Sequence, residues 1–178
     1  LDKAGLDESL LACGAHWPIG ENATRALLQA GKMPTPIHNN CSGKHAGMLA
    51  VARYLGYPLQ GYEKPEHPVQ KEIERILSDA CGVHLGREAM GIDGCSIPTF
   101  AMPLRGLATG FARLSTGKHL APQRAAAALR LMQACAANPV LVAGEGRFDT
   151  LVMGKLPGLV FAKGGAEGVH CAALPTLG

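Results

Sequence analysis

Apolar residues recur every three or four positions in several segments of the chain, which is the spacing of one face of an α-helix. The pattern is clearest over 66–80, where Pro68 lies in the first turn and Gly82 follows the last apolar position. The same spacing predicts further helices over 21–30, 44–55 (opening near Ser42), 103–114 and 122–137. A single helical turn is predicted over 7–12.

Shorter apolar segments bounded by glycine are typical of β-strands. They predict strands over 89–93, 159–162 and 168–174, the last two joined by the turn that begins at Lys163. The chain contains no internal repeat, charge block or low-complexity linker. We therefore predict a single domain of mixed helix and sheet over 1–178, in the α+β class.

The composition excludes several classes of protein. The chain has 17 Lys and Arg residues and 14 Asp and Glu residues. The resulting net charge of +3 is too small for a protein that binds nucleic acid electrostatically. A hydrophobic content of 47% with 17% charged residues excludes a disordered chain. No stretch approaches the roughly 18 consecutive apolar residues of a membrane span. We expect neither nucleic acid nor a membrane as partner.

Polar and reactive side chains are most concentrated over 38–45. The Gly-Lys pair within it resembles a phosphate-binding loop, but that motif requires a glycine at 38 and a Ser or Thr at 45, where this chain has histidines. Cys41 and Lys44 are three residues apart, so a helix places them on one face. The alternative is a buried cysteine at a helix start. Cys95 directly follows a predicted strand, although no two cysteines have CxxC spacing.

Lys163 ends a predicted apolar strand and opens a turn with two glycines. An amine packed among backbone loses hydration, which lowers the pKa of a lysine and makes it usable as a general base. Glu167 lies four residues further on and would oppose this effect by pairing with the amine. The alternative is a surface lysine at a strand end.

Several motifs, in this order along the chain, resemble the bacterial L-asparaginase II family first recognised in rhizobia. The matching segments are Cys13-Gly14-Ala15-His16-Trp17-Pro18, 38–49, Gly61-Tyr62, His67-Pro68-Val69-Gln70, Asp93-Gly94-Cys95, Pro98-Thr99-Phe100, Gly144-Glu145-Gly146-Arg147 and 163–168. The resemblance implies a mixed helix-and-sheet fold similar to serine β-lactamases and glutaminases. It also implies hydrolysis of L-asparagine to L-aspartate and ammonia by a Ser–Lys amidohydrolase.

The resemblance also assigns roles by position. Lys163 matches the catalytic lysine, and zinc is the implied cofactor, with Cys41, Lys44 and Cys95 as its ligands. Asp93 and His45 flank these ligands and are expected to bind the substrate or support the ligands from behind. The expected partner is the small molecule L-asparagine, and we expect a cytoplasmic enzyme that forms a homodimer.

The chain departs from the family pattern at both ends. The catalytic serines of the family precede the position of Leu1, and family chains continue beyond Gly178. We therefore expect an incomplete domain that is inactive by itself. The alternative is a non-catalytic fragment that binds zinc or a small ligand. A penicillin-recognising acyl-transferase would share the fold, but its Lys-Thr-Gly element has no match here.

Overall fold

The computed structural model describes residues 1–177 and separates into two compact units. The N-terminal unit comprises Leu1–Ile76 and Leu85–Ala101, and the C-terminal unit comprises Leu77–His84 and the chain from Met102 onward. The single domain over 1–178 stays a prediction.

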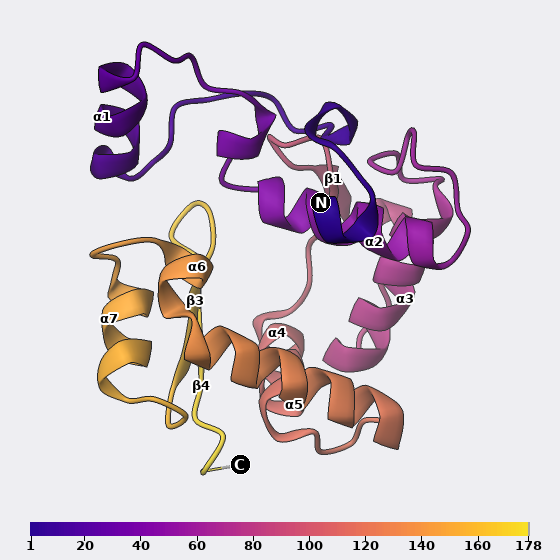
Figure 1. Cartoon of the computed structure of the whole chain (residues 1–178). Coiled ribbons are helices and arrows are strands. Elements are labelled where there is room, and N and C mark those ends of the chain that lie inside the picture. Colours follow the sequence, from indigo (N-terminus) through magenta and orange to yellow (C-terminus); the bar gives the residue numbers. More distant parts are fainter. Residues whose placement is uncertain (178) are drawn as a thin grey trace. The chain divides into compact units, whose positions relative to one another are not determined.

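The N-terminal unit is built from helices and one small hairpin (Figure 1). Its longer helices are α1 (Glu21–Gln29), α2 (Ser42–Tyr54) and α3 (Pro68–Cys81), which continues into the other unit. Its 3-10 helices are η1 (Asp2–Ala4), η2 (Glu8–Leu10), η3 (Pro36–His38) and η4 (Arg87–Ala89). The helices predicted over 21–30, 44–55 and 66–80 are thereby confirmed to within about two residues at each end.

Strands β1 (Met90–Ile92) and β2 (Pro98–Phe100) form an antiparallel pair with Met90 opposite Phe100. The sequence predicted β1 but not β2, because three residues that include a proline carry almost no strand pattern. Pro98 is accommodated because a strand of a two-stranded sheet has one free edge. The pairing makes 93–97 a tight hairpin loop, and this loop bears two of the predicted site residues.

The hydrophobic core of the N-terminal unit joins this hairpin loop to α2 and α3. Its buried members are Leu6, Leu11, Cys13, Leu49, Tyr62, Val69, Cys95 and Ile97. Two of these residues, Cys95 and Ile97, come from the hairpin loop itself, so core packing fixes the loop against the start of α2. The predicted helical turn over 7–12 is the 3-10 helix η2, and its flanking leucines enter the same core.

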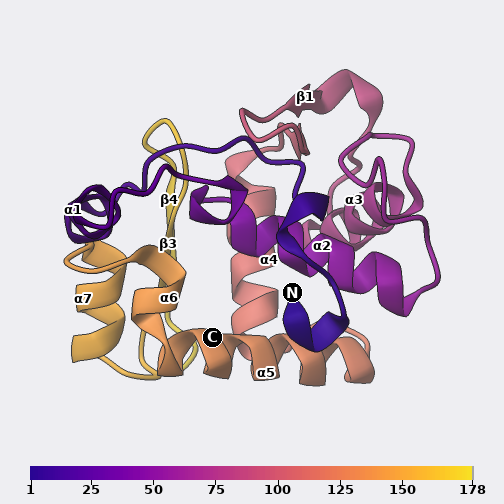
Figure 2. The same ribbon diagram turned by 45° about the horizontal axis from the view of Figure 1, so that its top comes forward.

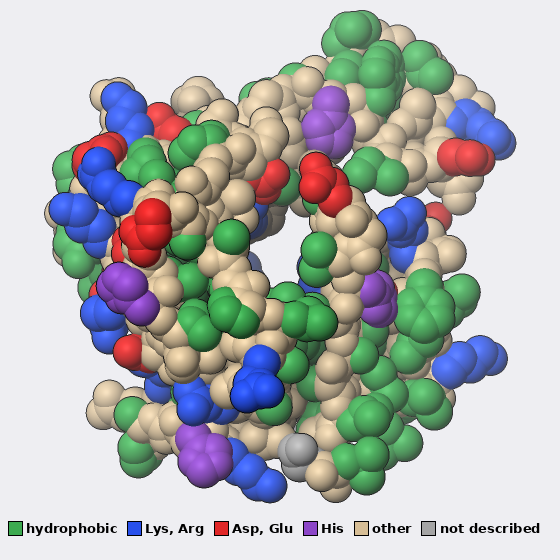
Figure 3. All heavy atoms as spheres, turned by 180° about the vertical axis from the view of Figure 1, so that it is seen from behind, with side chains coloured by type: hydrophobic (Ala, Val, Ile, Leu, Met, Phe, Trp, Pro, Cys, Tyr) green, Lys and Arg blue, Asp and Glu red, His purple; other side chains and the backbone are tan. Residues whose placement is uncertain are grey.

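The C-terminal unit contains further helices and a second hairpin. They are α4 (Leu104–Thr116), α5 (Pro122–Ala137), α6 (Pro139–Ala143), α7 (Phe148–Lys155), β3 (Phe161–Gly164) and β4 (His170–Ala173). Figure 2 shows α5 as the longest of these helices, and it packs on α4. Helix α7 packs on β3, and α6 packs on α7. Hydrophobic side chains gather over α7 and the β3–β4 hairpin at the lower right of Figure 3.

Two predictions for the C-terminal unit need correction. The strand predicted over 159–162 lies two residues later, as Phe161–Gly164, so Lys163 is inside the strand rather than after it. The sequence also missed α6 and α7. Helix α7 buries only Asp149 and Met153, so it lacks the apolar stripe by which a helix is recognised.

The architecture of helices with two small antiparallel sheets is compatible with the α+β class. The similarity to serine β-lactamases stays a prediction. Within the described residues, no helix combines the length and the apolar character needed to cross a membrane.

Candidate functional site

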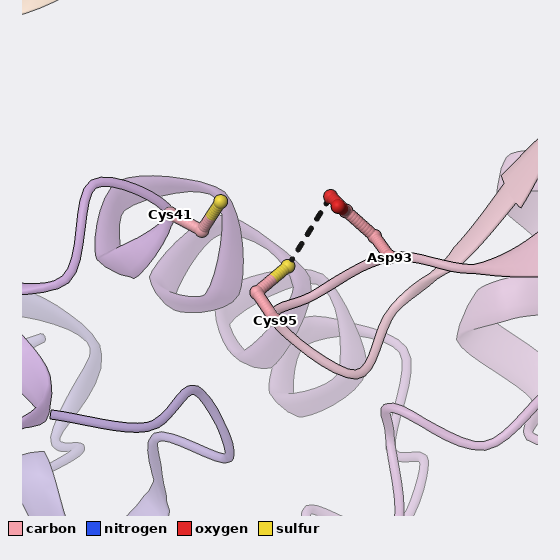
Figure 4. A group of neighbouring side chains, drawn as sticks. All are labelled: Cys41, Asp93 and Cys95. Carbon is pink, nitrogen blue, oxygen red and sulfur yellow. Dashed lines mark hydrogen bonds between the residues drawn. The ribbon is translucent and has the colours of Figure 1, made fainter. Parts of the chain in front are cut away.

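Cys41, Asp93 and Cys95 converge in the N-terminal unit (Figure 4). One ligand atom from each side chain, two sulfurs and a carboxylate oxygen, lies within 4.8 Å of the others. The Cys95 thiol donates a hydrogen bond to Oδ2 of Asp93 over 3.5 Å. The sequence separates Cys41 from this pair by more than fifty residues, and the packing of the hairpin loop against α2 brings them together.

Asn39 positions Cys41 at the start of α2. Cys41 is the residue that precedes the helix, and its N–H donates to Oδ1 of Asn39 over 2.8 Å. The Asn39 amide in turn donates to the carbonyl of Gly14 over 2.6 Å, and Asn39 is buried. His16 accepts a hydrogen bond from the N–H of Asn40 over 3.2 Å, so the 13–17 segment holds the loop before α2 at two points.

The hairpin loop positions Asp93 and Cys95 through its own backbone. The N–H of Gly94 donates to Oδ1 of Asp93 over 2.8 Å, and the N–H of Ser96 donates to the Asp93 carbonyl over 2.8 Å. Ser96 has φ 73°, a left-handed conformation in which L-residues are uncommon. This turn directs the Cys95 side chain into the core and leaves the Asp93 carboxylate half-exposed beside it.

Lys44 joins the cluster through Asp93. Its Nζ lies 3.2 Å from Oδ2 of Asp93, and both side chains are about two-fifths exposed, at 40% and 42%. Burial acts to lower the pKa of Lys44, but the neighbouring Cys41, Cys95 and Asp93 outweigh it and raise that pKa. For the Cys41 thiol, burial has the opposite effect and raises the pKa. A bound cation would lower the pKa of both groups, because a metal ion favours the thiolate and the neutral amine.

His45 is fully buried beneath the cluster. The hydroxyl of Tyr62 donates to its Nδ1 over 2.5 Å and accepts the N–H of Ala12 over 2.9 Å. Burial lowers the pKa of His45, and the charge of Lys44 adds to this effect. Of the two roles expected for His45, support from behind fits this burial, since a fully buried ring has no surface for a substrate.

The donor set suits the zinc ion implied by the family resemblance. Two cysteine sulfurs and a carboxylate oxygen are ordinary zinc ligands, and the Lys44 amine lies within reach of the same position. Sulfur donors favour zinc over magnesium or calcium, which prefer oxygen alone. Asp93 is therefore a candidate zinc ligand, in addition to its expected role in binding the substrate or supporting the other ligands.

Lys163 lies in the C-terminal unit, opposite Cys171 in the register of β3 and β4. Its side chain is exposed, and its amine donates to the carbonyl of Gly164. The sequence predicted that backbone at the strand end encloses this amine, and that prediction is wrong because the side chain is exposed. In the described part of the chain, Glu167 makes no ion pair with Lys163, although the sequence suggested one.

Sequence reasoning missed the residues that hold the site residues in place. Asn39 lies inside the 38–49 motif, two residues before Cys41, and this position was a signal that its amide could hold the start of the helix. Tyr62 also belongs to a quoted motif, but nothing in the pattern links it to His45. Asp149 next to Lys163 has no sequence signal, because it lies on a helix that the pattern does not predict.

Comparison with known proteins gives one result about the whole chain. A search of curated proteins found no match. A family model described as L-asparaginase II matches residues 1–178, which is every residue of the sequence. This match supports an asparaginase-type function in general, and L-asparagine as the kind of small molecule on which such enzymes act. The chain belongs to the L-asparaginase II family.

Proposed function

We propose that this chain carries the zinc ligands and one catalytic lysine of an enzyme that hydrolyses L-asparagine to L-aspartate and ammonia. The observation that carries the proposal is the family match over residues 1–178. The convergence of Cys41, Cys95 and Asp93 supports the zinc part of the proposal, since it brings ordinary zinc ligands from distant parts of the chain together. The alternative of a non-catalytic binding fragment has no comparable support.

Lys163 is the proposed general base. Its neutral amine takes the proton of a serine hydroxyl while the serine oxygen attacks the side-chain amide carbon of asparagine. The lysine returns that proton to the leaving nitrogen, ammonia departs, and an aspartyl ester remains. Water then attacks the ester, gives up a proton to the lysine, and releases aspartate while the serine regains its hydrogen. By the same resemblance, we propose that this serine belongs to a segment that precedes the position of Leu1.

Cys41 and Cys95 are the proposed thiolate ligands of zinc, with Lys44 as the amine ligand and Asp93 beside it. A zinc ion held there would supply positive charge able to polarise a substrate oxygen. The half-exposed Asp93 carboxylate is the group in the cluster suited to receive the α-ammonium of the substrate. From the same resemblance we also propose a β-lactamase-like fold, a homodimer and a cytoplasmic location.

The test is an ammonia-release assay with L-asparagine as substrate. It compares the chain of 178 residues with a longer chain that includes the residues encoded before Leu1. We expect turnover in the longer chain only. In that chain Lys163→Ala should lower kcat by about 10²-fold to 10⁴-fold, the usual contribution of a general base.

Lys155→Ala is the matched control, because Lys155 is also an exposed lysine of the C-terminal unit. It should leave kcat unchanged. Full activity of Lys163→Ala would remove Lys163 from the mechanism. Absence of asparagine hydrolysis from the longer chain, with zinc bound, would leave the binding fragment as the better description.

A further inference from the structure

A carboxylate that the proposed mechanism does not use lies next to Lys163. Asp149, on α7, is nearly buried, with its side chain 10% exposed. Its Oδ2 accepts the N–H of Gly164 over 2.7 Å, and its Oδ1 accepts Nε2–H of His170 over 2.5 Å. One side chain thus binds both strands of the β3–β4 hairpin at the residue pair that follows Lys163.

The register shows why this contact matters for Lys163. Gly164 faces His170 across the hairpin, and Lys163 faces Cys171. The amine of Lys163 donates to the carbonyl of Gly164, while the Gly164 N–H is held by Asp149. Lys163 therefore depends on Gly164 for its amine contact, and Gly164 depends on Asp149 for its position against α7.

We propose that Asp149 is a positioning residue for Lys163, which it holds through Gly164 and His170. The inference rests on the proposed role of Lys163 as the base. Asp149 does not touch the reacting atoms in this scheme. It fixes the strand that presents the amine, and a general base must be placed to within a fraction of an ångström of the proton it takes.

Space around the carboxylate agrees with this role. A Cβ added to Gly164 would lie 3.3 Å from Oδ2 of Asp149 and 3.7 Å from Cδ2 of His170. Glycine at this position thus admits the carboxylate to hydrogen-bonding distance of the backbone. Phe148 packs edge-on against the His170 ring, with centroids 5.4 Å apart, and so fixes the second partner of Asp149.

The charged groups around Lys163 come from three places. Asp149 faces its strand from α7, His170 lies on β4, and Glu167 lies in the connecting turn. Of these, Asp149 and His170 are hydrogen-bonded to each other, while no ion pair joins Glu167 to Lys163 within the described residues. Asp149→Asn separates position from charge, because an amide retains the length of the carboxylate and its capacity to bind Gly164.

The experiment measures kcat and KM for L-asparagine in the longer, active chain. Asp149→Ala should lower kcat by about 10²-fold with little change in KM, since the base is displaced while substrate contacts remain. Asp149→Asn should restore most of the lost kcat. Glu167→Gln, which removes a carboxylate from the same hairpin, should match the unaltered chain. Equal loss in Asp149→Asn and Asp149→Ala would overturn the proposal, because position would then not be the cause.

A second readout does not need activity. The amine of Lys163 is acetylated with acetic anhydride, and mass spectrometry gives its rate relative to Lys155 in the same molecule. Loss of the support in Asp149→Ala should raise this ratio by about threefold or more, because the strand that carries the amine is no longer held against α7 and opens locally more often. His170→Ala, which removes the other partner of Asp149 at a side chain 41% exposed, should change the ratio in the same direction.

The two readouts keep the proposals apart. If no chain hydrolyses asparagine but the acetylation ratio rises in Asp149→Ala, the proposed function fails and the support of Lys163 by Asp149 stands. If Asp149→Ala does not fold by circular dichroism, His170→Ala decides the question. An unchanged acetylation ratio and unchanged kcat in the folded variants would overturn the role of Asp149.

Discussion

The amine of Lys44 lies 3.2 Å from Oδ2 of Asp93, between α2 and the β1–β2 hairpin loop. This ion pair places a lysine next to two cysteine thiols, a combination in which the amine is charged as long as no cation is bound. Exposed ion pairs contribute about 0–1 kcal/mol to stability, so the pair has little structural importance by itself. Its value lies in keeping the amine beside the sulfur atoms that zinc would join.

Zinc binding is therefore expected to depend on both cysteines. Cys41→Ser and Cys95→Ser should each weaken zinc affinity by about 100-fold or more, because each removes one of the two proposed thiolate ligands. The measurement is zinc content by atomic emission after dialysis against a competing chelator. Cys135→Ser, which alters a half-buried cysteine of the C-terminal unit, is the matched control and should retain zinc.

The same measurement identifies the remaining ligand. Lys44→Met removes the amine, and Asp93→Asn leaves a weaker oxygen ligand of the same shape. We expect Lys44→Met to weaken zinc affinity by at least about 10-fold, the smallest loss usual even for groups that only support metal ligands. Normal zinc in Lys44→Met together with a deficit in Asp93→Asn would assign the position to the carboxylate instead.

Tyr62 supports the N-terminal unit through its hydroxyl. Tyr62→Phe leaves the Ala12 N–H and Nδ1 of His45 without their partner, and both lie in or beside the core. A buried polar group left unpaired costs about 1–3 kcal/mol, so the free energy of unfolding should fall by that amount. Urea denaturation measures it. Tyr54→Phe, at a residue 88% exposed, should change stability by less than about 0.5 kcal/mol.

Gly110 is required where α4 meets the end of α3. A Cβ at Gly110 would lie 2.7 Å from the sulfur of Cys81, which is itself buried. Crowding of this kind costs about 1–3 kcal/mol, and the helical preference of alanine returns part of it. Gly110→Ala should therefore lower the thermal midpoint. Gly154→Ala in α7, where the Cβ meets nothing within 4 Å, should leave it unchanged or raise it.

Asp149 should contribute to stability only above the acid range. Burial acts to raise the pKa of this carboxyl, but the hydrogen bonds from His170 and the Gly164 N–H outweigh burial and lower the pKa below its usual 3.8. As the pH falls through 3.8, the unfolded chain binds the proton first, and the stabilisation by the ionised carboxylate is lost progressively down to the lowered pKa.

The prediction for Asp149 is measured as the difference in thermal midpoint between the unaltered chain and Asp149→Asn. The unaltered chain should have the higher midpoint near pH 6, and the difference should shrink below pH 3.8. A difference that stays constant from pH 6 to the acid range would show that the charge of Asp149 has no part in stability.

Helices with strong local signals were predictable from the sequence. The prediction for α5, Pro122–Ala137, agrees with the structure at both ends, because Pro122 sets its start and Asn138-Pro139 its end. The strand register near Lys163 was not predictable to this accuracy. Two glycines and an apolar run fit several registers, and pairing with His170–Ala173 decides among them.

The identity of the candidate site residues was likewise predictable from the sequence, whereas their contacts were not. The sequence by itself determined the candidate side chains, because Cys41, Lys44, Cys95 and Lys163 belong to short motifs whose order is readable without a structure. Only the tertiary structure decided that His45 is buried beneath the cluster, that Asp93 lies against Lys44, and that Asp149 holds the strand of Lys163. Such contacts join residues far apart in the chain, and local patterns carry no information about which distant backbone a side chain will meet.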